Sequence, residues 1–423
     1  MSRLNKELSL LQGVGMLTTS LLGTGIFIVP AAAAALADAD SLWAWVVLTV
    51  LALPVAFTFA SLGQRYPHAG GAPALIGRAF GVSMERSVAF LFLAVIPVGL
   101  PAALMMTTGF WHAIFDLSPG MDLAMQLATL ALMLILGQRP ARASGQVQVA
   151  IAVMIVLTVA SFWWLGGLPG GRPVQPAVST VDWSAVTAAL TLMFWCFVGL
   201  EAFTHLGEEF RNPQRDFPLA LMLGVVLAGL VYWACSVAVV SFGIFGDAEA
   251  NRASLPNLVG LLWGEQWQWV AALIGYLACF ASINIYLQGF GRLLWSLADE
   301  GKLPASLAVL NRHGVPARAF NLVVLICAVC ALIAAWRGTD IDTLMRYANG
   351  NFVLVYLLSM ITGCVLLRGG ARLIALIASI CCALVLLWLG TQTFYALTVL
   401  LAFWIIDHLG GRRAIAARRK QSA

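Results

Sequence analysis

Two short stretches carry residues that could bind a small charged molecule within an otherwise apolar chain. The first is Gly23-Thr24-Gly25, near the middle of an apolar run from 8 to 36, with Pro30 one turn later. Glycine inside a helix costs about 1 kcal/mol relative to alanine, and proline removes a hydrogen-bond donor. We expect a break here, with a half-helix beginning near Gly25 that offers free N–H groups and the Thr24 hydroxyl to a carboxylate. Close helix packing through the glycines is the alternative.

The second stretch surrounds Glu201, the only acidic residue at hydrocarbon depth in any apolar run. An ionisable group near the bilayer centre costs roughly 2.5–3.5 kcal/mol on insertion scales and usually has a function. Because Gly199 weakens this helix, we expect free carbonyls just before it to accept hydrogen bonds from an ammonium group. These carbonyls belong to Trp195, Cys196, Phe197 and Val198. A structural role is the alternative, in which Glu201 caps freed N–H groups or pairs with His205 one turn later.

The composition places both stretches in a polytopic membrane protein. Of 423 residues, 61% are hydrophobic and 10% are charged, and the mean hydropathy is +0.90, a balance that excludes a soluble domain. The short polar segment before residue 8 does not resemble a cleaved signal peptide, so we expect the first span to be retained. The apolar runs predict twelve spans, at 8–36, 42–64, 87–115, 121–137, 146–168, 184–208, 217–244, 267–297, 317–336, 341–367, 371–389 and 392–409.

The basic residues support this count through their distribution between the spans. With twelve spans, all but four of the 24 Lys and Arg residues fall on one side; the exceptions are Arg172, Arg252, Arg337 and Arg346. By the positive-inside rule both termini are cytoplasmic, which requires an even number of spans.

The two expected breaks fall in the first and sixth spans, which indicates an internal repeat. Five spans per unit is an odd number, so the second unit enters the membrane from the opposite side, and the shared site lies at the midplane. We therefore expect a first repeat at 1–168 and a second at 183–367. Two further spans at 370–410 and a basic cytoplasmic tail at 411–423 complete the chain.

Three motifs resemble those of the amino acid–polyamine–organocation (APC) superfamily. They are Gly23-Thr-Gly-Ile-Phe-x-x-Pro30, Gly199-x-Glu-Ala followed by Glu209-x-x-Asn-Pro-x-Arg-Asp-Phe-Pro218, and Arg292 followed by Ala-Asp-Glu-Gly-x-x-Pro304. Within this superfamily the chain is most similar to bacterial exporters of L-methionine and branched-chain amino acids. The resemblance implies an all-α fold with a five-plus-five inverted repeat (LeuT-like) plus two C-terminal helices, in the bacterial inner membrane. It also implies that Trp195 and Tyr286 are aromatic gates, although ordinary packing is the alternative for Trp195.

The substrate expected from these features is a neutral amino acid with an apolar side chain. Apart from Glu201 and His205, no charged group falls at pocket depth. The side-chain pocket is expected to include Ile96, Leu100, Phe203, Tyr276, Phe280 and Phe352. Uptake or exchange of a cationic amino acid or polyamine is the alternative, because Glu201 could partner a positive charge.

Proton antiport is the expected coupling, with Glu201 and His205 as the proton-coupling residues. The fifth span lacks the Lys or Arg that some proton-coupled relatives place there, and a carboxyl group in apolar surroundings favours its protonated form. Sodium-coupled uptake through hydroxyls of the first and eighth spans, such as Ser282, stays open.

Other function classes lack the residues they need. The sequence contains no zinc-protease or nucleophile-elbow motif, no metal-ligand spacing of histidines, and no external cysteines for disulfides. Cys327 and Cys330 are expected to pack within a helix. We therefore expect no enzyme activity, cofactor or metal and no nucleic-acid partner, and a basic tail that meets anionic lipid. A monomer and a homodimer are both compatible with the sequence.

Overall fold

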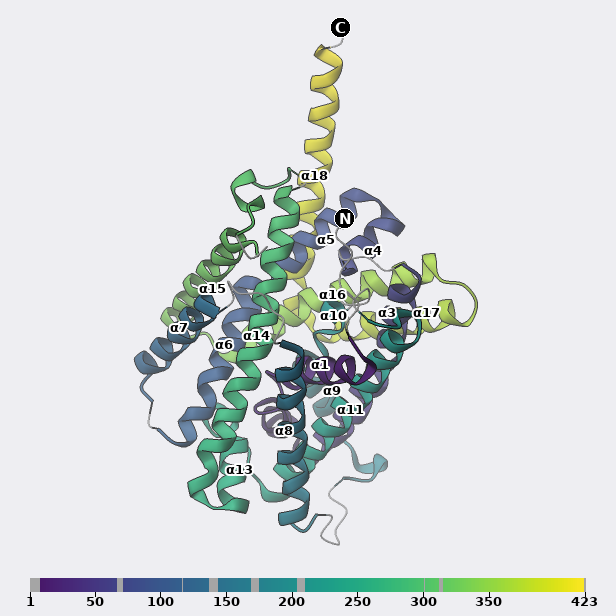
Figure 1. Cartoon of the computed structure of the whole chain (residues 1–423). Coiled ribbons are helices and arrows are strands. Elements are labelled where there is room, and N and C mark those ends of the chain that lie inside the picture. Colours follow the sequence, from purple (N-terminus) through teal and green to yellow (C-terminus); the bar gives the residue numbers. More distant parts are fainter. Residues whose placement is uncertain are drawn as a thin grey trace.

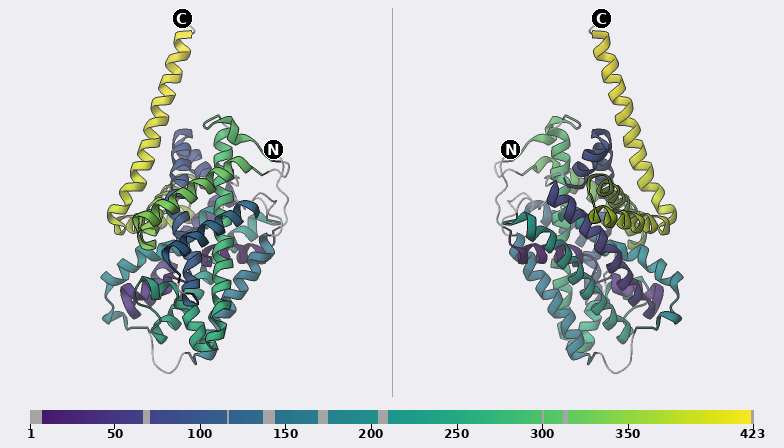
Figure 2. Two further views of the ribbon diagram at one scale, coloured as in Figure 1. Left: turned by 90° about the vertical axis from the view of Figure 1, so that its left-hand side faces the viewer. Right: turned by 90° about the vertical axis from the view of Figure 1, so that its right-hand side faces the viewer.

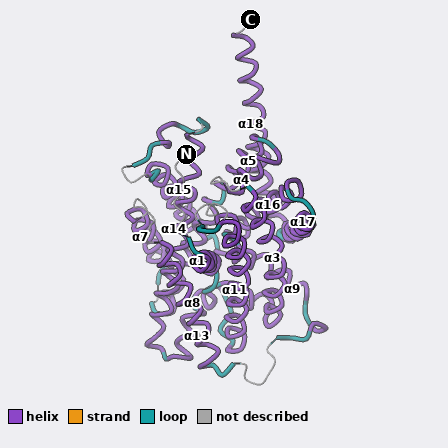
Figure 3. Tube along the Cα trace, turned by 45° about the vertical axis from the view of Figure 1, so that its right-hand side comes forward, coloured by secondary structure: helices purple, strands orange, loops and turns teal. Residues whose placement is uncertain are grey.

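The computed structural model describes residues 8–66, 71–115, 117–136, 144–168, 175–203, 210–299, 301–311 and 315–421. Helices, drawn purple in Figure 3, make up most of the trace. The only β-bridge among these residues joins Leu8 to Phe210, which brings the beginning of the chain beside the segment after the predicted sixth span. The last helix extends beyond the rest of the bundle, as both side views in Figure 2 show.

The first part of the chain forms eight α-helices (Figure 1). They are α1 (Leu10–Leu22), α2 (Val29–Ala37), α3 (Ser41–Arg65), α4 (Gly71–Phe80), α5 (Val82–Leu93), α6 (Ile96–Gly109), α7 (Pro119–Leu136) and α8 (Ser144–Leu165). A 3₁₀ turn, η2 (Phe110–Ala113), continues α6.

The second part contains ten α-helices and several 3₁₀ turns, among them η5 (Phe194–Phe197). The helices are α9 (Trp183–Met193), α10 (Leu200–Phe203), α11 (Pro213–Phe242), α12 (Ala248–Arg252), α13 (Ser254–Trp263), α14 (Gln268–Asp299), α15 (Ala317–Arg337), α16 (Ile341–Leu366), α17 (Gly370–Trp388) and α18 (Thr393–Gln421). Helices α12 and α13 occupy the stretch between the predicted seventh and eighth spans.

Ten helical stretches of the described chain are long and apolar enough to cross a membrane. This agrees with the all-helical, multi-pass membrane class expected from the composition. The predicted first and sixth spans each divide into shorter pieces, α1 with α2 and α9 with α10. The count of twelve spans and the inverted repeat stay predictions.

Polar residues and glycines at the loop ends fix where the long helices begin and end. Asp182 caps α9 by accepting a hydrogen bond from the Ser184 amide at 2.9 Å, and Asp340 caps α16 through the Thr343 amide at 2.6 Å. Each cap satisfies an N–H group that has no partner inside its helix. Gly338 ends α15 with a φ of +62°, a left-handed conformation that glycine adopts without steric cost.

The predicted third span is interrupted next to Pro97. Helix α5 ends at Leu93, and α6 begins at Ile96 with Pro97 in its first turn. Pro101 remains inside α6, where its ring prevents one backbone hydrogen bond. The segment before this span forms α4, which contacts α5, α10 and α16; the preceding residues 67–70 lie outside the described part.

Both broken spans lie among other helices rather than at the edge of the bundle. Helix α1 packs against α11 and α8, and α2 packs against α9 and α11. Helix α3 crosses α11 and contacts α9 and α17 as well. This packing covers irregular backbone with protein, which is the condition for tolerating it at membrane depth.

Candidate functional site

The first predicted break is confirmed, and it is wider than the sequence indicated. Helix α1 ends at Leu22 and α2 begins at Val29, with residues 23–28 in turns. The expectation that the second half-helix begins near Gly25 is therefore wrong. Pro30 is at the second position of α2, where a proline starts a helix well because that residue's N–H has no intrahelical acceptor.

Side chains from two neighbouring helices hold the carbonyl groups that the first break releases. The Tyr232 hydroxyl of α11 donates to the Leu21 carbonyl at 2.8 Å, and the Cys279 thiol of α14 lies 3.3 Å from the Gly23 carbonyl. In the described part of the chain, the amides of Thr24 and Gly25 have no acceptor within hydrogen-bond distance. The Thr24 and Gly25 amides are therefore the donors that this break leaves for an anion.

The second predicted break is also confirmed, at the expected glycine. Helix α9 ends at Met193, the 3₁₀ turn η5 follows, and α10 begins at Leu200. Val198 is extended, with φ −72° and ψ 132°. Gly199 has a φ of +126°, and a Cβ there would lie 2.9 Å from the Ser20 Oγ atom. Only glycine fits this position without strain.

Two of the four carbonyl groups expected to be free at this break already have donors. The Trp195 carbonyl accepts the Val198 amide at 3.2 Å, and the Phe197 carbonyl accepts the Tyr356 hydroxyl at 3.1 Å. For these two residues the expectation is wrong, because the 3₁₀ turn and helix α16 satisfy them. The Cys196 carbonyl has no donor within hydrogen-bond distance in the described residues.

The Glu201 carboxylate is buried at the second break, where three groups of the described residues donate to it. The Gly199 amide donates to Oε2 at 3.0 Å, the Tyr286 hydroxyl donates to Oε1 at 3.3 Å, and the Tyr356 hydroxyl also donates to Oε2. Only 1% of the residue is exposed. The capping role that the sequence left as an alternative is therefore present, and His205 lies outside the described residues.

A hydrogen bond joins the two breaks directly. The indole Nε1 of Trp195 donates to the Thr24 Oγ1 atom at 3.0 Å, and both residues are buried. Thr24 is thereby oriented, and its hydroxyl hydrogen remains available to a ligand carboxylate. The breaks also press together at Gly25, where a Cβ would lie 2.8 Å from the Cys196 sulfur.

A cavity of about 410 Å³ adjoins both breaks. Six predicted residues line it: Thr24, Leu100, Trp195, Val198, Tyr286 and Phe352. No charged side chain is among its lining residues. Polar groups therefore meet one end of a ligand, and hydrocarbon and aromatic groups surround the rest, the usual arrangement of a small-molecule site.

The other predicted residues lie outside this lining, at different distances from the breaks. Gly23, Gly25, Cys196, Phe197, Gly199 and Glu201 form the backbone and caps of the breaks themselves. Ile96 is buried beside the lining positions of α6. Phe203 packs against Phe210 and Phe217, with ring centroids 5.9 and 6.0 Å away. Tyr276 lies 3.1 Å from the Thr129 hydroxyl, and Phe280 packs on Tyr276.

Several lining residues were not found from the sequence, although helical spacing contains a signal for them. They are Ser20, Val95, Gly99, Ala103, Ile283 and Phe290; Ser282, considered only as a sodium ligand, also lines the cavity. Val95, the N-cap of α6, and Gly99 and Ala103 within α6 recur every four residues, and Phe290 follows Tyr286 by four on α14. On α6 the lining face is rotated about the helix axis relative to the predicted one, and on α14 it lies at another depth.

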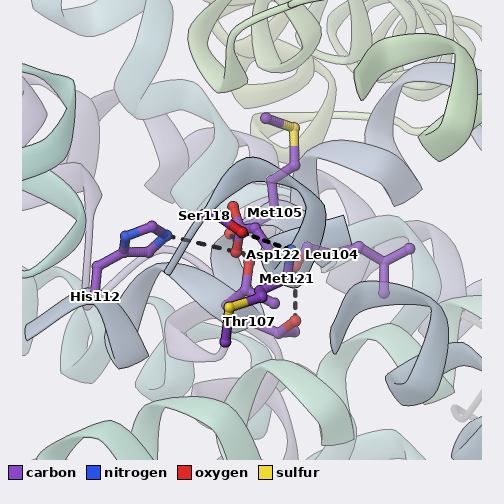
Figure 4. A network of polar contacts seen from close by, with 8 residues as sticks. Leu104, Met105, Thr107, His112, Ser118, Met121 and Asp122 are labelled. Atoms are coloured by element: carbon purple, nitrogen blue, oxygen red, sulfur yellow. Dashed lines mark hydrogen bonds and ion pairs between the residues drawn. The ribbon is translucent and has the colours of Figure 1, made fainter. Parts of the chain in front are cut away.

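A polar cluster at the end of η2 is separate from the cavity (Figure 4). The His112 Nε2 atom lies 3.5 Å from the Asp122 Oδ1 atom, and both side chains are mostly buried. Nearby, the Met121 amide donates to Ser118 at 3.4 Å. These contacts join η2 to the first turn of α7.

Comparison with known proteins places this geometry in context. The family model described as "Amino acid permease" matches residues 8–406. The L-methionine/branched-chain amino acid exporter YjeH of Escherichia coli (strain K12) is 48% identical over 406 residues, which cover 96% of this chain and 97% of the relative.

Two further relatives are more distant. The uncharacterized amino acid permease YecA of Bacillus subtilis (strain 168) is 26% identical over 97% of each chain. The cadaverine/lysine antiporter of Escherichia coli (strain K12) is 24% identical, over 85% of this chain and 83% of the relative. The names of these three relatives describe transport proteins, not enzymes.

Proposed function

The chain belongs to the amino acid permease family of the APC superfamily, and we propose that it exports neutral apolar L-amino acids from the cytoplasm. Methionine, leucine, isoleucine and valine are the proposed substrates. Transport is secondary active, proceeds by alternating access and exchanges the substrate for protons. The protein acts in the bacterial inner membrane with both termini in the cytoplasm.

The observation that carries this proposal is the junction of the two helix breaks. The Thr24 and Gly25 amides and the Cys196 carbonyl have no partner among the described residues, and they lie on segments joined by the bond between Trp195 and Thr24. An α-carboxylate and an α-ammonium group are only one carbon apart, so a site for both needs donors and acceptors at close range. Two breaks in contact supply both without a charged side chain.

The apolar remainder of the cavity favours a hydrophobic substrate side chain. Leu100 and Phe352 line it, together with Ile283 and Phe290. A cationic side chain placed among these residues would lose its hydration without a compensating charge. The relative that is 48% identical is an exporter of methionine and branched-chain amino acids, and the chemistry of this cavity agrees with that substrate class.

Glu201 is the proposed proton carrier, and it is linked to the cavity through Tyr286. The Tyr286 hydroxyl donates to the carboxylate, while the same residue lines the cavity. Protonation would remove the negative charge that the Gly199 amide and two tyrosine hydroxyls stabilise. In this proposal, the charge of the Glu201 side chain and the position of the gate residue Tyr286 change together.

The repeat provides the proposed mechanism of alternating access. In this proposal the first repeat, 1–168, and the second, 183–367, contribute one broken span each, and the substrate binds between them. Rocking of one repeat against the other would open the site to each side in turn. The two C-terminal spans, 370–410, stand outside the repeat, and the basic tail after them contacts anionic lipid.

Transport by purified protein in vesicles tests the proposal. Proteoliposomes are loaded with radiolabelled methionine, leucine, arginine or putrescine, and efflux is measured with and without an imposed pH gradient. We expect an inward proton gradient to accelerate efflux of methionine and leucine but not of arginine or putrescine. Empty vesicles and vesicles with dissipated gradients are the controls. Equal efflux of all four compounds, or no dependence on the gradient, would contradict the proposal.

Two alternatives have specific support, and the same vesicles distinguish them. The Ser20, Thr24 and Ser282 residues place hydroxyls at the cavity, which favours sodium-coupled uptake of neutral amino acids. The buried Glu201 beside it favours exchange of a cationic amino acid or polyamine. A sodium gradient that drives methionine uptake would support the first, and lysine or putrescine transport would support the second.

A further inference from the structure

The kink in the third span releases a backbone carbonyl close to the proposed substrate site. Pro97 has no N–H group, and its ring pushes against the preceding turn, so the helix is interrupted just before it. In a continuous helix the Val98 amide would donate to the Ala94 carbonyl. It donates to the Val95 carbonyl at 3.1 Å instead. The Ala94 carbonyl therefore needs a donor from another part of the molecule.

Two side chains from the last part of the chain donate to this carbonyl. The Tyr395 hydroxyl of α18 lies 2.9 Å from the Ala94 oxygen, and the Asn351 side-chain amide of α16 lies 3.4 Å from it. A carbonyl oxygen has two lone pairs, so both donors can bind at once. The shorter bond comes from α18, which belongs to the two C-terminal spans expected to stand outside the repeat.

Helix α18 packs along the part of the third span that precedes the kink (Figure 1). The rings of Phe90 and Phe403 stack with their centroids 4.3 Å apart, and Arg86 forms an ion pair with Asp407 at 2.9 Å. In these contacts the residue number rises along α5 as it falls along α18, so the two helices are antiparallel. Helix α18 thus supports α5 from Arg86 to the kink.

The segment directly after the kink forms the third span's side of the substrate cavity. Four of its residues line the cavity: Val95, Gly99, Leu100 and Ala103. The packing is close here, because a Cβ at Gly99 would lie 3.4 Å from the Ala348 Cβ atom and 3.9 Å from the Trp195 ring. A change in the angle of the kink would therefore alter the contacts of both the substrate and the gate residue Trp195.

We propose that Tyr395 is a positioning residue for substrate binding. Its hydroxyl holds the Ala94 carbonyl and so fixes the angle between α5 and α6, which sets where the lining residues of α6 stand relative to Trp195. Among the described residues, Tyr395 lies outside the cavity lining, so it acts on the substrate through the kink alone. Its effect on methionine affinity rests on the proposed function, whereas the hydrogen bond itself does not.

Two conservative substitutions in one aromatic pair test this role. Tyr395→Phe removes the hydroxyl and keeps the ring, which packs on Tyr347 with the centroids 5.9 Å apart. Tyr347→Phe is the matched control, because in the described part of the chain the Tyr347 hydroxyl has no hydrogen-bond partner and the residue is 36% exposed. Binding of radiolabelled methionine to purified protein in detergent gives the Kd, and efflux from proteoliposomes gives KM and kcat.

We expect Tyr395→Phe to raise the Kd and the KM for methionine roughly fivefold, the equivalent of one lost hydrogen bond of about 1 kcal/mol. Its kcat and its acceleration by a pH gradient should stay at wild-type values, because Glu201 and its donors are unchanged. Tyr347→Phe should match the wild type in every measurement. A substitution that only destabilised the fold would reduce the amount of active protein, and hence the maximal rate, without changing KM.

The possible outcomes separate the positioning role from the proposed function. Wild-type values of Kd and KM in Tyr395→Phe, or an equal rise of both in Tyr347→Phe, would overturn the positioning role. A loss of maximal rate alone in Tyr395→Phe would overturn it as well. If the wild-type protein neither binds nor exports methionine, the proposed function is wrong, and the positioning role for this substrate fails with it.

Discussion

Replacement of Glu201 by glutamine separates the ability to carry a proton from the structural role of the side chain. Within the described part of the chain, the Gly199 amide and the Tyr356 hydroxyl donate to its Oε2 atom and the Tyr286 hydroxyl donates to Oε1. A glutamine oxygen at the Oε2 position keeps the first two. Its amide group faces Tyr286, whose hydroxyl can rotate to accept instead of donate. The network therefore survives without an ionisable group.

Alanine at the same position gives the contrast and its magnitude. It would leave the Gly199 amide and the Tyr286 hydroxyl without this acceptor, whereas the Tyr356 hydroxyl keeps the Phe197 carbonyl. Each unsatisfied donor costs about 1–3 kcal/mol, so the sum is about 2–6 kcal/mol, a large part of the whole stability of a typical protein, about 5–15 kcal/mol. We therefore expect Glu201→Ala to be poorly expressed, and Glu201→Gln to remain folded with a small loss of thermal stability.

The assay compares gradient-driven efflux with substrate exchange in the same proteoliposomes. Glu201→Gln should exchange labelled for unlabelled methionine, because the binding site and the break are intact. A pH gradient should no longer accelerate its efflux, since no proton can bind or leave at this position. Gradient-driven efflux at the wild-type rate in Glu201→Gln would refute the assignment of Glu201 as proton carrier.

Three further substitutions test the geometry of the breaks. Gly199→Ala should destabilise the protein by about 1–3 kcal/mol, measured by thermal unfolding in detergent, because its φ is +126° and the new Cβ would approach Ser20. Trp195→Phe should raise the KM for methionine roughly fivefold, measured as efflux rate against loaded methionine concentration, since it removes a hydrogen bond to Thr24 of about 1 kcal/mol. Tyr232→Phe should lower thermal stability by about 1–3 kcal/mol, because the bond at 2.8 Å to a buried carbonyl is lost.

Each of these variants has an outcome that would contradict the reasoning. A Gly199→Ala protein as stable as wild type would mean that the second break is not held in the left-handed conformation. In a double-mutant cycle, the effects of Trp195→Phe and Thr24→Val on KM should not add, and simple additivity would show that the two side chains do not interact. If Tyr232→Phe unfolds like wild type, the first break does not depend on α11.

The positions of both breaks could be predicted because each rests on a local cost. Glycines within an apolar span weaken a helix whatever surrounds them, and a lone acid in such a span must have a buried partner. The length of the first break, residues 23–28, could not be predicted from such a local cost. Its released carbonyls depend on Tyr232 and Cys279, which are more than 200 residues away in sequence. No local pattern reports such contacts.

The cavity lining was less predictable because the rotation of a helix about its axis is set by its neighbours. The sequence placed Leu100 correctly on the site-facing side of α6, yet Ile96 lies beside the lining and Gly99 within it. In α14, Tyr276 and Phe280 are ten and six residues from Tyr286, about 15 and 9 Å along a helix. They belong to another depth of the bundle, where Tyr276 contacts Thr129 instead.

Tyr356 connects two features that the sequence treated separately. Its single hydroxyl hydrogen is shared between the Glu201 carboxylate and the Phe197 carbonyl. A change in the charge of Glu201 would alter the strength of the first bond, because hydrogen bonds to charged groups are roughly twice as strong as neutral ones. The same change would therefore loosen the hold of α16 on the second break. Coupling and gating thus need no long pathway, because the proposed proton site and the irregular backbone share this one hydroxyl.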